Sequence, residues 1–395
     1  MENELNKIKN CEVCQNNNLT EVLNLGNHPL CDDLIKIGSN KKNEEYPIKI
    51  LFCNRCKTAH QKYQVSKEKL FTDDYHYRAK VTGDVLNGMK DLVKSCKDFL
   101  GDLDKLKVLD IGCNDGSLLN FFQAEGAQTF GIDPTGAAKE AIDKHKVIKG
   151  YFDKNNAKIL LNENGTFDVI TFTNVFAHIE DLPSLIDNLQ TLMNENTLLI
   201  IENHYLGDVL SKKQFDTFYH EHPRTYSLKS FCVISELMSR QISKFEFVSR
   251  YGGNIRVFIS KTPTTQEFAE ELDFIEQFKE LDKFIKNWQV QKKLEITKLN
   301  NKYGALPAKA FPGRAAILIK LLDIDENYIS AVYEIKGSIK TGYYVPGTRI
   351  PILPEADLYK KEKQLPIINL AWHIPKAVRN NLTKNEYLAE VIDIL

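Results

Sequence analysis

The sequence has almost no net charge and no long apolar run. Its 395 residues include 52 lysines and arginines against 53 aspartates and glutamates, which gives a formal net charge of −1. Because nucleic-acid-binding domains usually carry a basic excess, we expect no nucleic-acid partner. No apolar run reaches the length of roughly 18 residues that a membrane-spanning helix needs, so we expect no membrane segment. The polar opening MENELNKIKNCEVC lacks the apolar core of a signal peptide, and we therefore expect a cytoplasmic protein.

Internal repeats and low-complexity segments are also absent, and the chain is longer than one compact core usually requires. Residues 1–70 hold five of the eight cysteines. Residues 71–240 alternate short apolar runs with helical patterns, which is typical of a parallel sheet with crossover helices. Residues 241–395 combine further strands with a long helix and predict a second, smaller α/β domain. We therefore predict three domains with these boundaries.

The two larger regions contain segments that predict individual elements. Four apolar runs in the middle region predict buried strands: KVLDIG (107–112), QTFGID (128–133), FDVITFTN (167–174) and TLLIIEN (197–203). In the third region, FEFVSR and GGNIRVFISK predict strands. Apolar residues at near-helical spacing, from Phe268 and Leu272 to Trp288, predict a helix around 265–300. ALPAKAFPGRAAILIKLL (305–322) predicts a strand, a glycine-containing turn and a helix.

Two Cys-x-x-Cys pairs lie in the first region, with 38 residues between them. Cys11 and Cys14 form one pair, and Cys53 and Cys56 form the other. Each turn can present two thiolates to one ion, so two turns complete the tetrahedral four-cysteine site that zinc prefers. The alternatives are two unrelated thiol pairs or a redox pair, but redox motifs occur singly. Because all four positions would be protein ligands, we predict a structural rather than a catalytic zinc ion.

The segment VLDIGCNDGSLLNFF (108–122) predicts a strand, a glycine-rich turn and a helix. Gly112 and Gly116 allow a sharp turn and a close approach to a ligand. Asp133 ends the next predicted strand, where an acid can accept hydrogen bonds from ribose hydroxyls. The pattern is Asp-x-Gly-x-x-x-Gly rather than the Gly-x-Gly-x-x-Gly of dinucleotide-binding folds, and it resembles motif I of S-adenosylmethionine (SAM) methyltransferases. The predicted cofactor-binding residues are Asp110, Gly112, Asn114, Gly116, Asp133, Pro134 and Asn174.

This difference in pattern has a physical basis. SAM has no pyrophosphate to place on a helix N-terminus. Its carboxylate and ammonium groups need backbone N–H groups and a nearby acid such as Asp110. A nucleotide-binding fold without methyl transfer is the alternative, because a fold does not determine a function.

The stretch YHEHPRTY (219–226) concentrates ionisable side chains between the strand TLLIIEN and a predicted helix capped by Ser227. Ligands bind at the carboxyl ends of the strands in open α/β sheets, and this connection lies there. His220 and His222 are two residues apart, so in an extended segment they share one face, with Glu221 opposite. The i, i+4 spacing of a helical zinc pair is absent. The pattern favours a general-base cluster over a metal site or a surface polar loop.

Motifs along nearly the whole chain resemble those of the sugar C-methyltransferases of deoxysugar biosynthesis, which act on nucleotide-linked 4-ketosugars. Besides the cysteine module, they are YHYRA, DIGCNDG, GIDP, NVFAHIED, FDTFYHEHPRTYS, YGGNIRVF, YVPGTRIPI and LAWHI. The resemblance implies that His222 is the base that takes the proton from the carbon to be methylated. It also implies that the sugar site is lined by Tyr219, Glu221, His178 and either Tyr75 or Tyr77.

The resemblance further implies an α/β fold made of an N-terminal four-cysteine zinc module, a central Rossmann-like SAM methyltransferase domain and a smaller C-terminal α/β domain. SAM and structural zinc are the implied cofactors, a nucleotide sugar is the implied substrate, and we expect a monomer. Two segments depart from the family's pattern. Arg78-Ala79-Lys80 stands where the family has serines, and FPGRAAILI (311–319) stands where it has a glycine loop with a lysine. Both departures bear on the identity of the substrate.

Three other functions remain open at this point. O- or N-methylation of a sugar or a related small molecule would use the same SAM fold. A zinc-module RNA methyltransferase also combines these two domains, but the balanced charge disfavours binding to a phosphate backbone. A non-catalytic SAM or nucleotide sensor would leave the YHEH segment and the two tyrosines without a role.

Overall fold

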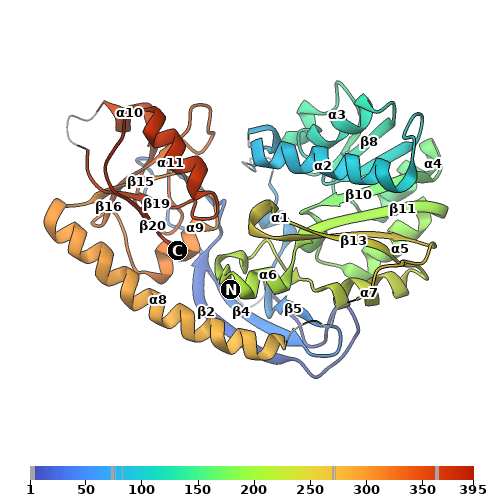
Figure 1. Ribbon diagram of the computed structural model, residues 1–395, viewed down its shortest axis with the longest axis horizontal. Coiled ribbons are helices and arrows are strands. Elements are labelled where there is room, and N and C mark those ends of the chain that lie inside the picture. Colours follow the sequence, from blue (N-terminus) through green and yellow to red (C-terminus); the bar gives the residue numbers. More distant parts are fainter. Residues whose placement is uncertain are drawn as a thin grey trace. The chain divides into compact units, whose positions relative to one another are not determined.

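The computed structural model describes residues 5–72, 75, 77–81, 83–268, 271, 273–360 and 364–395. The chain folds into two compact units, both of the α/β class (Figure 1). Unit 1 comprises Met1–Glu21, Leu51–Lys212 and Glu221–Ile275. Unit 2 comprises Val22–Ile50, Lys213–His220 and Glu276–Leu395.

Unit 1 is built around a seven-stranded sheet with the strand order β13-β14-β11-β10-β7-β8-β9. The strands are β7 (Lys107–Ile111), β8 (Gln128–Asp133), β9 (Lys146–Lys149), β10 (Phe167–Thr173), β11 (Met193–His204), β13 (Gln241–Val248) and β14 (Asn254–Ser260). The five strands from β11 to β9 are parallel, whereas β14 and β13 pair in antiparallel fashion. The four strands predicted in the middle region are confirmed as β7, β8, β10 and β11.

The antiparallel pair β13 and β14 extends this sheet, although the sequence pattern places its residues in the third region. In the register, Leu199 of β11 lies opposite Ile259, and Ile201 lies opposite Val257. Every residue of β14 is buried, which accounts for its apolar character. Gly253 adopts φ +142° in the turn between the two strands, a conformation that glycine tolerates without strain. The division into domains at residues 70 and 240 stays a prediction.

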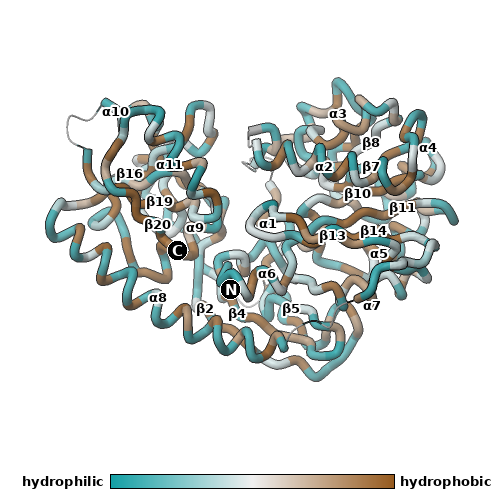
Figure 2. Tube along the Cα trace, viewed as in Figure 1, coloured by the Kyte–Doolittle hydropathy of each residue, from teal (hydrophilic) through white to brown (hydrophobic). Residues whose placement is uncertain are grey.

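Alternating residues of the strands supply two apolar clusters, because successive side chains point to opposite faces of a sheet. Leu109 and Ile111 of β7 belong to the cluster that includes α5 and α7. Val108 of the same strand belongs to the cluster that includes α2 and α3. Figure 2 shows the hydrophobic strands of this sheet in brown. The helices of unit 1 are α1 (Lys67–Leu70), α2 (Gly83–Leu100), α3 (Ser117–Ala124), α4 (Lys154–Asn164), α5 (Leu182–Leu192), α6 (Leu206–Ser211) and α7 (Leu228–Leu237).

Short strands precede the central sheet. They are β1 (Leu5–Lys7), β2 (Thr20–Pro29), β3 (Ile35–Lys36), β4 (Glu45–Cys53), β5 (Thr58–Gln61) and β6 (Tyr63–Val65). β1 pairs with β6, and a second sheet has the order β12-β5-β4-β2. In this sheet the two-residue strand β12 (Arg224–Thr225) pairs antiparallel with β5. The chain that follows YHEH is therefore bonded to the strand that follows the second cysteine pair.

Unit 2 contains a smaller parallel sheet with the order β18-β16-β15-β19-β20. Its strands are β15 (Leu306–Lys309), β16 (Ile329–Glu334), β18 (Ile352–Pro354), β19 (Ile367–Asn369) and β20 (Val391–Asp393). Its helices are α8 (Phe274–Tyr303), α9 (Ala315–Leu321), α10 (Glu355–Tyr359) and α11 (Pro375–Lys384), and β17 (Tyr343–Tyr344) pairs with β3. The predicted smaller α/β layer and the strand, turn and helix at 305–322 are confirmed. Across the described ranges, every helix is too short or too polar to cross a bilayer.

The long helix begins later than predicted, at Phe274 rather than near residue 265. Phe268 is not part of it and is 46% exposed. The helix begins later because the residues before it interact with β13 instead. The side chain of Gln266 bonds both the N–H (2.8 Å) and the carbonyl (3.2 Å) of Phe245, and the Phe268 ring stacks on the Phe245 ring. Leu272, also counted in the predicted stripe, lies outside the described residues.

Candidate functional site

The two Cys-x-x-Cys pairs meet at one point. The sulfur atoms of Cys11, Cys14, Cys53 and Cys56 all lie within 4.8 Å of one another. Cys11 Sγ is 3.3 Å from Cys56 Sγ, and Cys14 Sγ is 3.6 Å from Cys53 Sγ. Four thiolates this close repel each other unless a cation lies between them, and the donor set matches the tetrahedral preference of zinc. The structure thus brings the four predicted ligands together, and they fit a structural zinc ion.

Each cysteine pair lies in a tight turn. Gln15 N–H donates to the carbonyl of Cys11 at 2.9 Å, and Lys57 N–H donates to the carbonyl of Cys53 at 2.8 Å. Both turns end in a left-handed residue, because Gln15 has φ +59° and Lys57 has φ +57°. The backbone N–H of Cys14 also points at the sulfur of Cys11, 3.4 Å away. The local sequence therefore forms the two turns that present the sulfur atoms.

A chain of polar side chains leads from the cysteines to the region after β10. His60 Nε2 lies 3.3 Å from Cys11 Sγ, and His60 Nδ1 lies 3.4 Å from a carboxylate oxygen of Glu12. Glu12 pairs with Arg224 over 2.9 Å. The buried guanidinium of Arg224 also donates to the carbonyls of the two residues that follow His178. Burial opposes the charge of Glu12, but Arg224 and His60 outweigh it and lower the pKa of Glu12 to about 2.

The glycine loop joins β7 to α3 and touches the segment after β10. Gly112 has φ +77°, and a Cβ atom on it would lie 2.4 Å from Cγ2 of Val175. Gly116 also has φ +77° and is the N-cap of α3. Asp110 is buried and accepts a 2.7 Å hydrogen bond from the Thr171 hydroxyl. Burial raises the pKa of Asp110 to about 7, against the effect of Thr171, so a bound cation would favour its charged form.

Asp133 ends β8, and the surrounding loops hold its carboxylate. It accepts hydrogen bonds from the N–H of Asn114 (2.9 Å), the N–H of Thr135 (2.8 Å) and the hydroxyl of Thr135 (2.6 Å). Asn114 has φ +49°, which turns its N–H toward the carboxylate. These three hydrogen bonds fix the orientation of the carboxylate at the end of β8. Binding of a ribose hydroxyl by Asp133, next to Pro134, stays a prediction.

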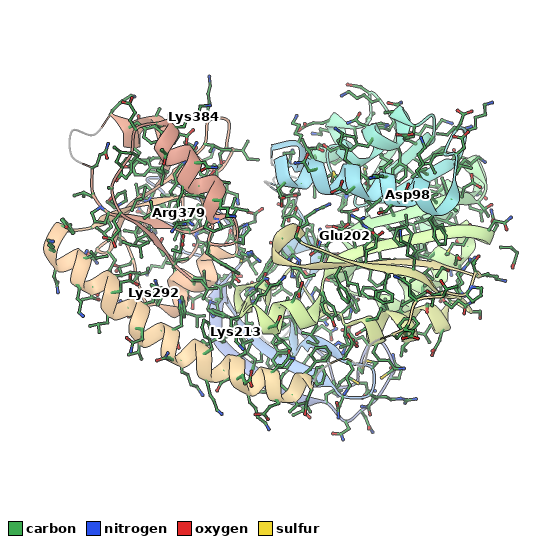
Figure 3. The ribbon with its side chains drawn as sticks, in the orientation of Figure 1. Asp98, Glu202, Lys213, Lys292, Arg379 and Lys384 are labelled. Atoms are coloured by element: carbon green, nitrogen blue, oxygen red, sulfur yellow. The ribbon has the colours of Figure 1, made fainter. Side chains whose placement is uncertain are left out.

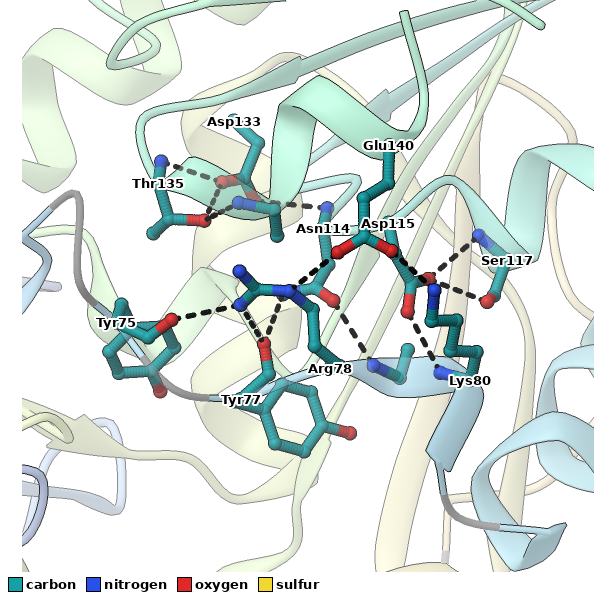
Figure 4. A network of polar contacts seen from close by, with 12 residues as sticks. Tyr75, Tyr77, Arg78, Lys80, Asn114, Asp115, Ser117, Asp133, Thr135 and Glu140 are labelled. Carbon is teal, nitrogen blue, oxygen red and sulfur yellow. Dashed lines mark hydrogen bonds and ion pairs between the residues drawn. The ribbon is translucent and has the colours of Figure 1, made fainter. Parts of the chain in front are cut away.

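The segment from Tyr77 to Lys80 lies against both of these loops (Figure 4). The side-chain amide of Asn114 donates to the carbonyl of Tyr77 at 3.2 Å and accepts from the N–H two residues later at 3.1 Å. Arg78 Nε donates to one carboxylate oxygen of Glu140 at 3.0 Å, and Lys80 Nζ donates to the other at 2.5 Å. The first departure from the family's pattern thus borders the predicted SAM site.

His222 lies between two other histidines. Its ring centroid is 4.9 Å from that of His178 and 5.2 Å from that of His204, with an edge-to-face arrangement in both cases. Phe71 packs on His178 at 5.2 Å. Burial, reinforced by His222, lowers the pKa of His178 well below its usual range, so His178 is neutral at pH 7. The structure thus brings the predicted His178 and His222 together and adds His204, which the sequence pattern did not single out.

The YHEH segment turns instead of running extended. Residues 219–221 form a bend and a turn before the chain enters β12, so the predicted common face of His220 and His222 is wrong. His220 Nε2 lies 3.0 Å from the carbonyl oxygen of Tyr46 within unit 2, which assigns it to holding the loop. His220, Glu221 and His222 are only 3%, 6% and 6% exposed, which excludes a surface polar loop. Among the described residues, the four cysteines form the one group with metal-binding geometry.

The two tyrosines of the Tyr-x-Tyr segment have different partners. Tyr75 donates a 2.9 Å hydrogen bond to Oε2 of Glu221. The Tyr77 hydroxyl lies 2.5 Å from that of Tyr251, and burial together with Tyr251 raises the pKa of Tyr77 well above its usual range. Tyr251 has φ +53°, an uncommon conformation for an aromatic residue. Tyr75 is therefore the tyrosine that reaches YHEH, while Tyr219 belongs to unit 2 and its role stays a prediction.

Glu202 is a fully buried carboxylate on β11 (Figure 3). It pairs with Arg256 at 2.8 Å and accepts a 3.2 Å hydrogen bond from Nδ2 of Asn254. The same amide nitrogen donates to Oδ1 of Asn174 at 3.1 Å, and Asn254 Oδ1 lies 2.9 Å from His204 Nδ1. This network connects the predicted Asn174 to the histidine cluster. A single acid inside the apolar run TLLIIEN was its only signal in the sequence.

Unit 2 brings together parts of two motifs that carry the family resemblance, FDTFYHEH and LAWHI, and the FPGRAAILI segment that departs from it. Arg314 of the FPGRAAILI segment is 8% exposed, and its Nη1 donates to the hydroxyl of Thr217 at 3.1 Å. Arg314 Nε lies 3.3 Å from Oδ2 of Asp216, which also accepts a 2.9 Å hydrogen bond from the Trp372 indole. The guanidinium lies 5.3 Å from the Trp372 ring centroid. The second departure from the family's pattern is therefore built into a buried ionic cluster.

Three family models match consecutive parts of the chain. A zinc binding domain matches residues 11–71, a methyltransferase domain matches residues 84–237, and a C-methyltransferase C-terminal domain matches residues 250–390. In its order of domains the chain is similar to C-methyltransferases that carry an N-terminal zinc-binding domain. The zinc-binding domain and its four cysteines agree with the predicted zinc ion, and the methyltransferase domain agrees with the predicted cofactor SAM.

Two relatives and one solved structure are similar to parts of this chain. C-methyltransferase NovU from Streptomyces niveus is 27% identical over 270 residues, which cover 68% of this chain and 64% of NovU. A ubiquinone biosynthesis O-methyltransferase from Rhodopseudomonas palustris (strain BisB5) is 32% identical over 117 residues, 27% of this chain and 46% of that protein. The match thus spans less than two thirds of the length of either relative. The SAH-bound magnesium protoporphyrin IX methyltransferase from Synechocystis PCC 6803 superposes with a TM-score of 0.36 at 18% identity, over 45% of this chain and 84% of that one.

Replacing Gly112 with alanine is expected to weaken SAM binding by about tenfold or more. A left-handed φ costs an L-residue about 1–2 kcal/mol, and the new Cβ atom would overlap Val175. Isothermal titration with SAM measures the change in affinity. Gly101→Ala is the matched control, because Gly101 also has a positive φ (+91°) but nothing lies within 4 Å of its added Cβ atom. Unchanged SAM affinity in the Gly112→Ala variant would exclude this loop as the cofactor site.

Proposed function

We propose that this chain is a SAM-dependent C-methyltransferase that deprotonates a carbon next to a ketone of a nucleotide-linked sugar and methylates that carbon. The observation that carries the proposal is the cluster in which the buried His222 contacts the partly buried His178 and His204. The matching C-methyltransferase C-terminal domain and the similarity to NovU support carbon as the methylated atom. The family resemblance supports the nucleotide-linked ketosugar as substrate.

The residue types suit this chemistry. A carbon beside a ketone is acidic only because the resulting enolate places its charge on the ketone oxygen. His222 acts as the base that takes the proton. Neutral His178 is a hydrogen-bond donor for the enolate oxygen, and the Tyr75 hydroxyl becomes a second donor only when its single proton turns from Glu221 to that oxygen. Glu221 accepts the Tyr75 hydrogen bond and so orients that hydroxyl for the sugar site.

The cofactor loop and the histidine cluster share one segment of chain. Residues 174–178 provide Val175, against which Gly112 packs, and also His178, which contacts His222. When bound, SAM supplies an electrophilic methyl group on its sulfonium. A short connection between the two sites favours a fixed distance between the acceptor carbon and that methyl group.

Methyl transfer to a nucleotide-linked 4-ketosugar tests this proposal. The purified protein is incubated with SAM and the ketosugar, and mass spectrometry is expected to find a product heavier by one methyl group. NMR is expected to place the new methyl group on the carbon next to the ketone. A methyl group on oxygen or nitrogen would instead establish the O- or N-methyltransferase alternative, which the similarity to O-methyltransferases favours. A cytoplasmic location and a monomeric state remain predictions.

A further inference from the structure

The orientation of the Asn254 amide is fixed by its neighbours. Asn254 is fully buried, and its Nδ2 lies 3.2 Å from the carboxylate of Glu202 and 3.1 Å from Oδ1 of Asn174. Glu202 pairs with the Arg256 guanidinium at 2.8 Å, and a carboxylate in such a pair accepts hydrogen bonds, so the amide nitrogen faces Glu202. Asn254 Oδ1 therefore faces His204, and no reversal of the amide group satisfies the same contacts.

This orientation determines which nitrogen of His204 carries the proton. Asn254 Oδ1 is an acceptor and lies 2.9 Å from His204 Nδ1, so Nδ1 is the protonated nitrogen of the ring. In a neutral imidazole with a protonated Nδ1, Nε2 carries the lone pair. The network anchored on Glu202 thus holds His204 in the tautomer whose Nε2 can accept a proton.

His204 is also placed beside the proposed base. Among the described ring contacts of His222 are those with His178, at 4.9 Å between centroids, and with His204, at 5.2 Å. The surroundings of His178 oppose a charge on its ring, which makes it a poor acceptor for a proton from His222. His204 is only partly buried and ends β11, so one side of it is open to solvent.

We propose that His204 is the second member of a proton relay in which it receives, on Nε2, the proton that His222 removes from the substrate carbon. The inference rests on the proposed function and deepens it. The C–H bond breaks, its electron pair stays on the carbon as the enolate, and the proton moves to His222. It then moves to His204 and leaves to water, which returns His222 to its neutral form before the next turnover. With SAM bound, the enolate carbon would form the new bond to the methyl group as the bond between methyl and sulfur breaks, and the electron pair of the broken bond would stay on sulfur.

His204→Asn is the variant that tests the relay. The asparagine amide nitrogen stands near the position of Nδ1 and keeps the hydrogen bond to Asn254, while the Nε2 acceptor is removed. The substrate carries deuterium on the reactive carbon, and S-adenosylhomocysteine fills the cofactor site. We expect loss of deuterium to solvent to fall at least about tenfold in the variant, because the proton on His222 returns to the carbon. In a single turnover with SAM, methyl transfer is expected to change less than about threefold.

Two outcomes would overturn the relay. Equal losses of deuterium washout and of single-turnover methyl transfer would indicate a structural role for His204, and unchanged washout would indicate no role. His28→Gln serves as a control for replacing a buried histidine, because His28 lies in unit 2 and only its Nε2 bonds a carbonyl, that of Leu25 at 2.8 Å.

The tautomer itself provides a readout that does not depend on any substrate. In protein labelled with ¹⁵N-histidine, NMR is expected to find neutral His204 with its proton on Nδ1, and Asn254→Ala is expected to release this preference. If neutral His204 of the unmodified protein carries its proton on Nε2, the relay is refuted even if methyl transfer succeeds. Wild-type protein with the expected tautomer but no methyl transfer to any ketosugar would instead refute the proposed function.

Discussion

Removal of zinc from the four-cysteine cluster is expected to unfold the N-terminal part of unit 1 and to abolish methyl transfer. Metal binding and folding are coupled in such sites, where the apparent binding free energy of zinc is about 10–16 kcal/mol in zinc-finger peptides. Loss of the Cys11 turn displaces Glu12, which leaves the buried guanidinium of Arg224 without its carboxylate partner.

Chelation followed by metal analysis and thermal unfolding measures this effect. We expect about one zinc ion per chain before treatment, a large drop in melting temperature after it, and recovery when zinc is returned. Cys53→Ser is expected to reproduce the loss. Cys232→Ser is the matched control, because Cys232 is half-buried and lies outside the cluster. A zinc-depleted protein with an unchanged melting temperature and full activity would contradict a structural zinc site.

Replacement of His222 with asparagine is expected to lower the rate of methyl transfer by about 10²–10⁴-fold, the usual contribution of a general base. Asparagine has a similar size and polarity but cannot take the proton at neutral pH. SAM affinity is expected to stay within about twofold, because the cofactor loop reaches this cluster only through residues 174–178. Single-turnover mass spectrometry and SAM titration measure the two quantities.

His220→Gln provides the comparison within the same motif. The glutamine amide can still donate to the carbonyl of Tyr46, which His220 Nε2 approaches at 3.0 Å. Its methyl transfer is therefore expected to fall less than about threefold. Near-full turnover of His222→Asn would sink the proposed mechanism, and an equal loss in both variants would show that the substitutions only disturb the loop.

The parts of the fold and site that could be predicted from the sequence are those with a local cause. Strands β7, β8, β10 and β11 are predicted from short apolar runs in the sequence. The N-cap of α7 is predicted from Ser227, whose hydroxyl accepts from Ser230 N–H at 3.1 Å. The cysteine cluster follows from spacing, because each turn brings its own two sulfur atoms together.

The parts that could not be predicted depend on partners distant in the sequence. β14 joins the central sheet because it pairs with β11, and about 55 residues separate the paired positions. His204 gains its place beside His222 only when β11, β14 and the YHEH turn meet. The bend at residues 219–221 arises because the following strand β12 pairs with β5, and nothing within YHEH itself specifies this.

Arg224 makes the zinc module and the methyltransferase domain inseparable. Its guanidinium is supplied by the methyltransferase part of the chain, its carboxylate partner comes from Glu12, and its remaining hydrogen bonds fix the backbone just after His178. A methyltransferase domain excised from this chain would therefore keep a buried cation and lose the anion that neutralises it. A chimaera that combines a module of this protein with a module of a relative therefore has to keep both Glu12 and Arg224.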